Sequence, residues 1–286
     1  MANILITGAN GQVGKSIHSI QSLFNHHRFH FATKKELDIT NFQSISDHLD
    51  YNQIDWIINC AAYTAVDKAE EEEKEAYLIN ETGVINIGKA SLEKQIGVIH
   101  ISTDYVYHSN FGIPFKETSI TNPQSVYASS KLAGELAILR YNPKSFILRT
   151  SWVYSEYGHN FVKTMLRLGE ARETIRVVCD QIGAPTYAKD LAMATIQLID
   201  TQAEYGIYNF ANSGTTSWYN FTNAIFAHVG IDCMVIPIRT DEYPTAALRP
   251  PYSIMNLSKI QNALQIEIRG WEDALKECLS RVGQMV

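Results

Sequence analysis

The stretch at residues 3–21, NILITGANGQVGKSIHSIQ, decides the fold. It opens with a short apolar run, Ile4 to Ile6, passes through glycines and ends in a helical pattern. A short apolar run of this kind is typical of a strand that is buried on both faces. We therefore expect a strand, a tight turn and a helix at the start of the chain.

Three glycines mark the turn, because Gly8, Gly11 and Gly14 form the pattern G-x-x-G-x-x-G. The first permits a sharp bend, the second lets the backbone approach a pyrophosphate, and the third permits close packing of the helix on the strand. The N-terminus of the helix then faces the phosphate charge. Since the glycines stand between a strand and a helix, the pattern predicts a dinucleotide site.

The rest of the chain repeats this alternation of apolar runs and helical stretches. Strands that alternate with helices predict a parallel sheet covered on both faces. Because βαβ crossovers are right-handed, we expect an α/β protein with a Rossmann-type, doubly wound parallel sheet. The further apolar runs lie at 29–33, 56–62, 97–103, 145–154 and 175–180.

From about residue 215 the rhythm changes to a striped helix, a loop-rich stretch with Pro244, Pro250 and Pro251, and a last helix at 271–284. This change predicts a smaller C-terminal substrate-binding lobe over the carboxyl ends of the strands. The predicted domains are a NAD(P)-binding Rossmann domain, residues 1–150 plus about 176–215, and the lobe, about 151–175 and 216–286.

Composition limits the partners. Lys and Arg total 24 and Asp and Glu total 30, so the net charge of −6 argues against a nucleic-acid partner. The four cysteines lie far apart and lack the spacing of a zinc site. No run reaches the roughly 18 apolar residues of a membrane helix, and the N-terminus lacks the basic start of a signal peptide. These features predict a cytoplasmic protein with no membrane partner.

The end of the second predicted strand indicates which cofactor is bound. An acidic residue at that point would bind the ribose 2′-hydroxyl and repel a 2′-phosphate. Here Ala32 and Thr33 stand there, followed by Lys34 and Lys35. The two lysines favour NADPH. NADH stays open, because the same lysines are also compatible with simple exposure to solvent.

A second site is indicated by VYASSK at residues 126–131, which places Tyr127 four residues before Lys131 on one helix face. The spacing alone has little weight, because such pairs occur by chance. The pair follows ISTDYVY, however, where an apolar strand ends at Thr103. In an open α/β sheet, ligands bind beyond the carboxyl ends of strands, so these three side chains are expected to converge on one small molecule.

The three residue types suit the reduction of a ketone, in which a hydride goes to carbon and a proton goes to oxygen. A free tyrosine has a pKa of about 10, and a neighbouring lysine ammonium would lower the pKa of Tyr127 toward the working pH. Lys131 can also hydrogen-bond the nicotinamide ribose, and Thr103 can polarise the carbonyl. We therefore expect Thr103, Tyr127 and Lys131 to be catalytic.

Several longer stretches carry a family resemblance. They are GANGQVG (8–14), ELDIT (36–40), NCAAYTAVDKAE (59–70), ISTDYVY (101–107), YASSKLAGE (127–135), LRTSWVY (148–154), DQIGAPTYAKDLA (180–192) and ALRPPYS (247–253). In these residues the chain resembles the extended short-chain dehydrogenases/reductases and, more narrowly, the dTDP-4-dehydrorhamnose reductase family. The resemblance implies NAD(P)H-dependent reduction of the 4-keto group of dTDP-4-dehydro-6-deoxy-L-mannose to dTDP-L-rhamnose, the last step of dTDP-rhamnose biosynthesis, which supplies bacterial polysaccharides.

Matching positions also imply roles, with Tyr127 as the proton donor and Lys131 as its partner. The predicted cofactor-binding residues are Gly8, Asn10, Gly11, Gln12, Val13, Gly14, Thr33, Lys34, Asp38, Ile39, Ala61, Ala62, Tyr63, Thr64, Tyr127 and Lys131. The implied substrate-binding residues are Thr103, Asp104, Trp152, Asn160 and Arg249. Arg249 would meet the diphosphate of the substrate. The alternatives for two of these residues are a simple core position for Trp152 and a surface ion pair for Arg249.

One departure from the family concerns metal and oligomeric state. In the family that this chain resembles, some members form a dimer bridged by Mg²⁺ through two glutamates. One glutamate follows the glycine loop and the other follows the GAPT stretch. Those positions hold Ser16 and Lys189 here. Because a charged lysine cannot ligate a cation, we expect no metal site and either a monomer or a dimer without a metal bridge.

Two other functions stay open. One is another nucleotide-sugar 4-ketoreductase; a dehydratase is disfavoured because Asp104 is followed by Tyr105 and not by a second acid. The other is a non-catalytic NADP-binding regulatory homologue, against which the intact set of Thr103, Tyr127 and Lys131 argues. Turnover with NADPH separates an enzyme from a binding protein.

Overall fold

The computed structural model describes residues 1–108 and 112–284. Its centre is a six-stranded sheet with the order β10-β5-β4-β3-β1-β2, in which all neighbouring strands are parallel. The chain runs from β1 to β2 on one side and then crosses to β3 on the other, so the sheet is doubly wound and the predicted fold class is confirmed. The strands are β1 (Asn3–Thr7), β2 (Arg28–Ala32), β3 (Trp56–Asn59), β4 (Gly97–Thr103), β5 (Ser145–Thr150) and β10 (Gly206–Phe210).

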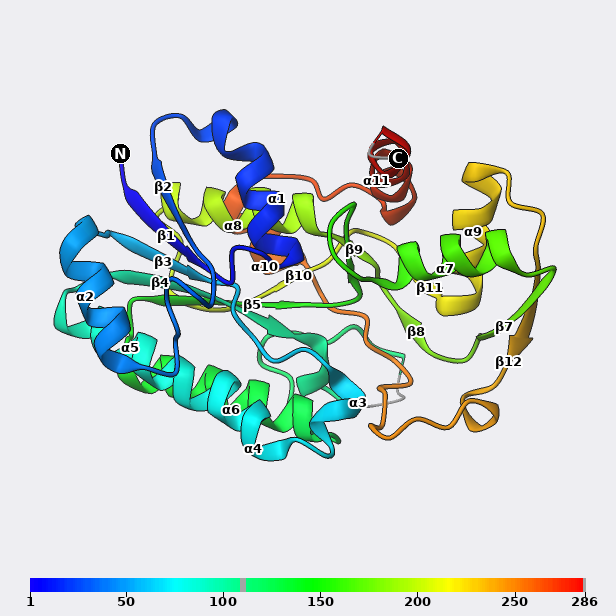
Figure 1. Ribbon diagram of the computed structural model, residues 1–286, viewed down its shortest axis with the longest axis horizontal. Helices are drawn as coiled ribbons and strands as arrows, with labels where there is room; N and C mark the ends of the chain where they lie inside the picture. Colours follow the sequence, from blue (N-terminus) through cyan, green and yellow to red (C-terminus); the bar gives the residue numbers. More distant parts are fainter. Residues whose placement is uncertain (109–111, 285–286) are drawn as a thin grey trace.

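The first strand shows why both faces of the sheet are covered. Ile4 and Ile6 belong to one hydrophobic core, and Leu5 between them belongs to another, because successive side chains of a strand point to opposite faces. Helices α1, α8 and α10 cover the first core, and α2, α5 and α6 cover the second (Figure 1). These helices are α1 (Gln12–Ile20), α2 (Phe42–Asn52), α5 (Gly83–Glu93), α6 (Val126–Tyr141), α8 (Ala188–Asp200) and α10 (Ser258–Leu264).

Short helical segments complete this part of the molecule. They are the 3₁₀ turns η1 (Gln21–Phe24) and η3 (Asp104–Val106), the helices α3 (Val66–Ala69) and α4 (Glu73–Tyr77), and the π-helical turn η2 (Leu78–Thr82). Across residues 1–108 and 112–284, no helix combines the length and the apolar character needed to cross a membrane.

A smaller group of elements, at the right of Figure 1, has a hydrophobic core of its own that includes Val162, Phe221, Trp271 and Leu275. Its strands form three short pairs: β7 with β12 and β6 with β9, both parallel, and β8 with β11, which is antiparallel. The elements are β6 (Val153–Tyr154), α7 (Phe161–Ala171), β7 (Thr174–Val178), β8 (Ile182–Gly183), β9 (Thr186–Tyr187), β11 (Thr216–Ser217), α9 (Trp218–Val229), β12 (Met234–Ile238), η4 (Thr240–Glu242) and α11 (Trp271–Gln284).

Three features differ from what the sequence predicted. The apolar run 145–154 is not one strand, because the chain leaves the sheet after β5 and Trp152 takes a left-handed φ of +47°. Most of β7 falls inside the predicted Rossmann segment, yet this strand pairs with β12. Conversely, α10 falls inside the predicted lobe and packs on the main sheet. Both boundaries depend on long-range pairing, which local patterns do not encode. The division into two domains stays a prediction.

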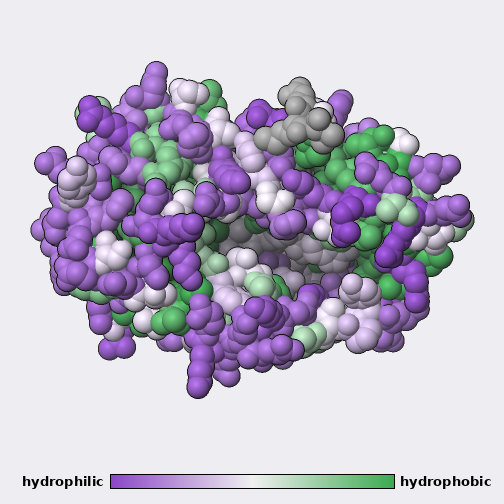
Figure 2. Space-filling view, in the orientation of Figure 1, coloured by the Kyte–Doolittle hydropathy of each residue, from purple (hydrophilic) through white to green (hydrophobic). Residues whose placement is uncertain are grey.

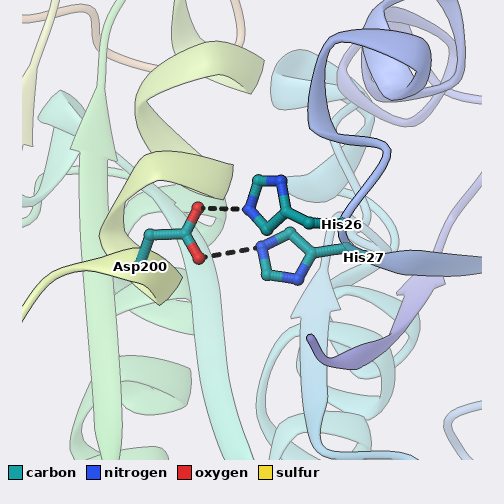
Figure 3. Close-up of side chains that lie close together, drawn as sticks. All are labelled: His26, His27 and Asp200. Atoms are coloured by element: carbon teal, nitrogen blue, oxygen red, sulfur yellow. Dashed lines mark hydrogen bonds and ion pairs between the residues drawn. The ribbon is translucent and has the colours of Figure 1, made fainter.

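A cluster of His26, His27 and Asp200 joins the start of β2 to the end of α8 (Figure 3). Both Nε2 atoms lie 3.0 Å from the Asp200 carboxylate. The buried ring of His27 also accepts a hydrogen bond at Nδ1 from the Ala2 N–H, at 3.2 Å. A neutral His27 therefore carries its proton on Nε2, which is the wrong form for ligating a metal through that atom. The geometry fits a hydrogen-bonded cluster around the Asp200 carboxylate.

Burial, partly offset by Asp200, lowers the pKa of His27. The unfolded chain therefore takes up this proton at a higher pH than the folded chain, and His27 lowers the free energy of unfolding as the pH falls below about 6.5. We expect His27→Gln, which cannot titrate, to lose less stability than wild type between about pH 8 and pH 5.5 in urea unfolding. The exposed His26→Gln is the matched control. Equal losses for wild type and His27→Gln would contradict this account.

Candidate active site

The carboxyl ends of the parallel strands open into a cavity of about 550 Å³, where the face of the molecule in Figure 2 is hollowed. Thr103 from the end of β4, Tyr127 and Lys131 from the first two turns of α6, and Trp152 after β5 all line it. The glycine turn reaches the same cavity through Gly11 and its neighbours. The structure thus brings the residues predicted for catalysis together with the start of α1.

The glycine turn fits a dinucleotide. Gly8 has a φ of +63°, and a Cβ on it would lie 2.6 Å from the backbone N of Ala61. A Cβ on Gly14 would lie 2.7 Å from the Cα of Ala9. The described residues place no side-chain cap on the first turn of α1, which starts after Gly11, so its N–H groups stay available to a phosphate.

The predicted binding residues fall into several groups. Those that line the cavity beyond the strand ends are Asn10, Gly11, Gln12, Val13, Ala62, Thr64, Thr103, Tyr127, Lys131, Trp152 and Asn160. A neighbouring cavity of about 220 Å³ is lined by Gly8, Gly11, Lys34, Asp38, Ile39, Ala61 and Ala62. Thr33 lines a third hollow with Asn10. Four predicted binding residues line none of these three cavities in the part of the chain that the structure describes. They are Gly14, Tyr63, Asp104 and Arg249.

The first turn of α6 is fixed by its cap, since the Ser125 side chain accepts a hydrogen bond from the Ala128 N–H. Burial raises the pKa of Tyr127 to about 12, although a hydrogen bond with the Thr103 hydroxyl acts in the opposite direction. The expectation that Lys131 lowers the pKa of Tyr127 is therefore wrong for this structure. The Lys131 Nζ instead donates to the backbone oxygen of Ile101, at 2.7 Å.

Lys131 is held at the end of a buried polar chain that crosses three strands. Thr7 and Asn59 are paired between β1 and β3, and Asn59 and His100 between β3 and β4. The Asn59 carbonyl accepts hydrogen bonds from the Thr7 hydroxyl and the Ala61 N–H, so its amide group donates to His100 Nδ1, at 3.0 Å. The second ring nitrogen, Nε2, lies 3.4 Å from Lys131 Nζ.

This chain fixes a neutral histidine beside the lysine. Because Nδ1 of His100 accepts from Asn59, the proton of the neutral ring sits on Nε2 and faces Lys131. Burial and the charge of Lys131 hold the pKa of His100 well below its usual value. Burial also lowers the pKa of Lys131 to about 8, against opposing effects of Glu135 and Cys60. Lys131 can therefore change protonation state near neutral pH.

One turn further along α6, Glu135 forms a buried ion pair with Arg149 of β5, and their side chains are only 1% and 3% exposed. The Arg149 Nε lies 3.0 and 3.1 Å from the two carboxylate oxygens. The carboxylate also accepts the Ser102 hydroxyl of β4, and Arg149 donates to the Tyr107 hydroxyl. This network ties α6 to the two strands whose ends form the cavity.

Three predicted substrate residues are buried or already engaged within the protein. Arg249 makes two hydrogen bonds with the Asp67 carboxylate, at 2.6 and 2.7 Å, which matches the alternative reading of an ion pair. Asp104 is buried, and burial raises its pKa to about 7. Asn160 does line the cavity, but its amide donates to Gln12 and to the Ser155 backbone.

Sequence reasoning missed Trp218, the first residue of α9, which also lines the cavity. Its ring stacks on that of Trp152, with centroids 3.5 Å apart and planes 10° from parallel. Gly183 leaves room for this arrangement, since a Cβ there would lie 2.5 Å from the Trp152 ring. No local signal marks Trp218, because the stack depends on packing between distant segments.

Comparisons with known proteins agree with this geometry. The family model of the RmlD substrate binding domain matches residues 1–284. The dTDP-4-dehydrorhamnose reductase of Aggregatibacter actinomycetemcomitans is 43% identical, over 96% of this chain and 98% of its own. The spore coat polysaccharide biosynthesis protein SpsK of Bacillus subtilis is 39% identical, over 98% and 97%. The crystal structure of dTDP-4-dehydrorhamnose reductase from Bacillus anthracis in complex with NADP has a TM-score of 0.94, with 39% identity over 98% and 99% of the two chains.

The buried pair predicts a large effect of one substitution. Glu135→Gln leaves the Arg149 charge buried without its partner and is expected to lower the free energy of unfolding by about 3–5 kcal/mol in urea titrations. Arg176→Gln, which breaks the exposed pair with Glu242, should cost less than about 1 kcal/mol. The account fails if the two variants lose similar stability.

Proposed function

Because this chain belongs to the dTDP-4-dehydrorhamnose reductase family, we infer that it is an NAD(P)H-dependent oxidoreductase. It reduces the 4-keto group of dTDP-4-dehydro-6-deoxy-L-mannose to give dTDP-L-rhamnose, the last step of dTDP-rhamnose biosynthesis. The observation that carries this conclusion is the convergence of Thr103, Tyr127 and Lys131 on one cavity that the glycine turn also lines.

The nicotinamide cofactor supplies the hydride for the reduction. The chain's part is to hold it, and the open first turn of α1 is placed to bind the pyrophosphate. Asp38 and Ile39 border the smaller cavity, on the adenosine side. Lys131 and Thr64 border the larger cavity, where the nicotinamide end belongs.

Tyr127 is the proton donor in this proposal. With its pKa raised to about 12, the phenol keeps its proton at neutral pH, which is the form that a reduction requires. Thr103 provides a hydroxyl that hydrogen-bonds the same carbonyl oxygen and fixes its position. Lys131, whose Nζ is held by the Ile101 oxygen, borders the same cavity and is placed to hydrogen-bond the nicotinamide ribose.

The substrate-binding residues remain part of the proposal. The stacked Trp152 and Trp218 offer an aromatic surface to the sugar. Arg249 binds the diphosphate when the phosphate oxygens replace the Asp67 carboxylate. This exchange is possible because a carboxylate and a phosphate can each accept two hydrogen bonds from one guanidinium. Asp104 and Asn160 contribute polar groups beside the sugar.

The oligomeric state and the location are proposed on separate grounds. The positions that would supply glutamates for a metal bridge between subunits hold Ser16 and Lys189, which have no carboxylate. Ser16 is buried, and the Lys189 ammonium is paired with Glu277. We therefore propose a monomer or a dimer without a metal bridge. We also propose a cytoplasmic location, because the substrate is a nucleotide sugar.

The test follows NADPH oxidation by its absorbance with the dTDP-4-keto-6-deoxy-L-sugar as substrate. Wild type is expected to turn over, and Tyr127→Phe to lose about 10²–10⁴-fold in kcat because only the proton donor is removed. Tyr51→Phe, at an exposed position, is the control and should match wild type. Fluorescence titration checks that Tyr127→Phe still binds NADPH. A wild type that binds NADPH without turnover would instead indicate the non-catalytic homologue.

A further inference from the structure

We propose that Glu36 sets the choice between NADPH and NADH by holding the hydrogen-bond donors that a 2′-phosphate would otherwise take. The inference rests on the proposed use of a nicotinamide dinucleotide. It concerns the end of β2, where the ribose 2′-hydroxyl lies in folds of this class. Thr33 is the first residue after that strand, and a hydrogen bond from the Ala9 N–H to the Ala32 oxygen, 3.2 Å, holds the glycine turn beside it.

The donors of Thr33 are already engaged. One oxygen of the Glu36 carboxylate accepts from the Thr33 N–H and from the Thr33 hydroxyl, both at 2.8 Å. These two bonds lower the pKa of Glu36, so the carboxylate is charged at neutral pH. An anion thus sits where the residues after β2 offer their donors. The anion belongs to Glu36, three residues after Thr33. For this reason the residue at the end of the strand is not itself acidic.

The basic residues near Thr33 and Glu36 would also attract the 2′-phosphate of NADPH. Thr33 and Glu36 line a hollow of about 500 Å³ together with Asn10, Lys15 and His18 of the glycine turn and α1. Lys34 follows directly and lines the smaller cavity beside it. The basic side chains come from α1 and from the turn after β2, and among the residues that line the 500 Å³ hollow Glu36 carries the carboxylate.

This arrangement has opposite consequences for the two cofactors. A phosphate carries about −1.5 to −2 charges at neutral pH, so it is repelled by Glu36 and gains the Thr33 donors only when the carboxylate moves away. A ribose hydroxyl is neutral and does not need this movement. Glu36 therefore penalises NADPH and offsets the attraction of the lysines, which narrows the difference in affinity between the cofactors.

The experiment measures dissociation constants by tryptophan fluorescence or calorimetry for wild type, Glu36→Gln and Glu36→Ala, each with NADPH and NADH. Removing the charge is expected to tighten NADPH about tenfold and to leave NADH within about twofold. Adenosine 2′,5′-bisphosphate against AMP repeats the comparison with only the 2′-phosphate differing. Glu71→Gln, an exposed glutamate in the turn before α4, is the control and should leave both constants unchanged.

A ratio of affinities that stays within about twofold of wild type would overturn the proposal. So would a change in the ratio that comes only from weaker NADH binding, because Glu36 would then act as a ribose ligand. The measurement needs no sugar substrate. A wild type that binds both cofactors without reducing the sugar would therefore contradict the proposed function and leave this inference to be decided by the binding constants.

Discussion

The buried ion pair between Glu135 and Arg149 is the contact on which the geometry of the site depends. Two charges with almost no exposure are tolerated only when their hydrogen bonds are complete, and here the partners come from α6, β4 and β5. The ion pair and its hydrogen bonds hold these three elements against one another. The turn of α6 that holds Lys131 is then fixed against the end of β4, so that Tyr127 and Thr103 can share a hydrogen bond.

Burial also sets the charge state of the reacting groups. It raises the pKa of the Tyr127 phenol and lowers that of the Lys131 amine, so each is shifted toward its neutral form. His100 adds no charge, because Asn59 fixes it as a neutral ring with its N–H toward Lys131. In the proposed reaction, the phenol therefore keeps its proton until a substrate carbonyl accepts it.

Part of this could be predicted from the sequence because it is encoded locally. The apolar run before Gly8, the glycine spacing and the strand that ends at Thr103 each combine a hydrophobic pattern with a turn or a chemical group, and the sheet edge brings them together. The pairing of β7 with β12, the contact of Arg249 with Asp67 and the stack of Trp218 on Trp152 join distant segments. No local pattern encodes such contacts.

In the proposed reaction, the site delivers a hydride to C4 of the sugar and a proton to the oxygen on C4. The most direct measurement uses NADPH carrying deuterium at the transferred position, followed by NMR of the product. The proposed reaction places deuterium at C4 of the sugar in dTDP-L-rhamnose. A product without deuterium, or with deuterium at a different carbon of the ring, would contradict it.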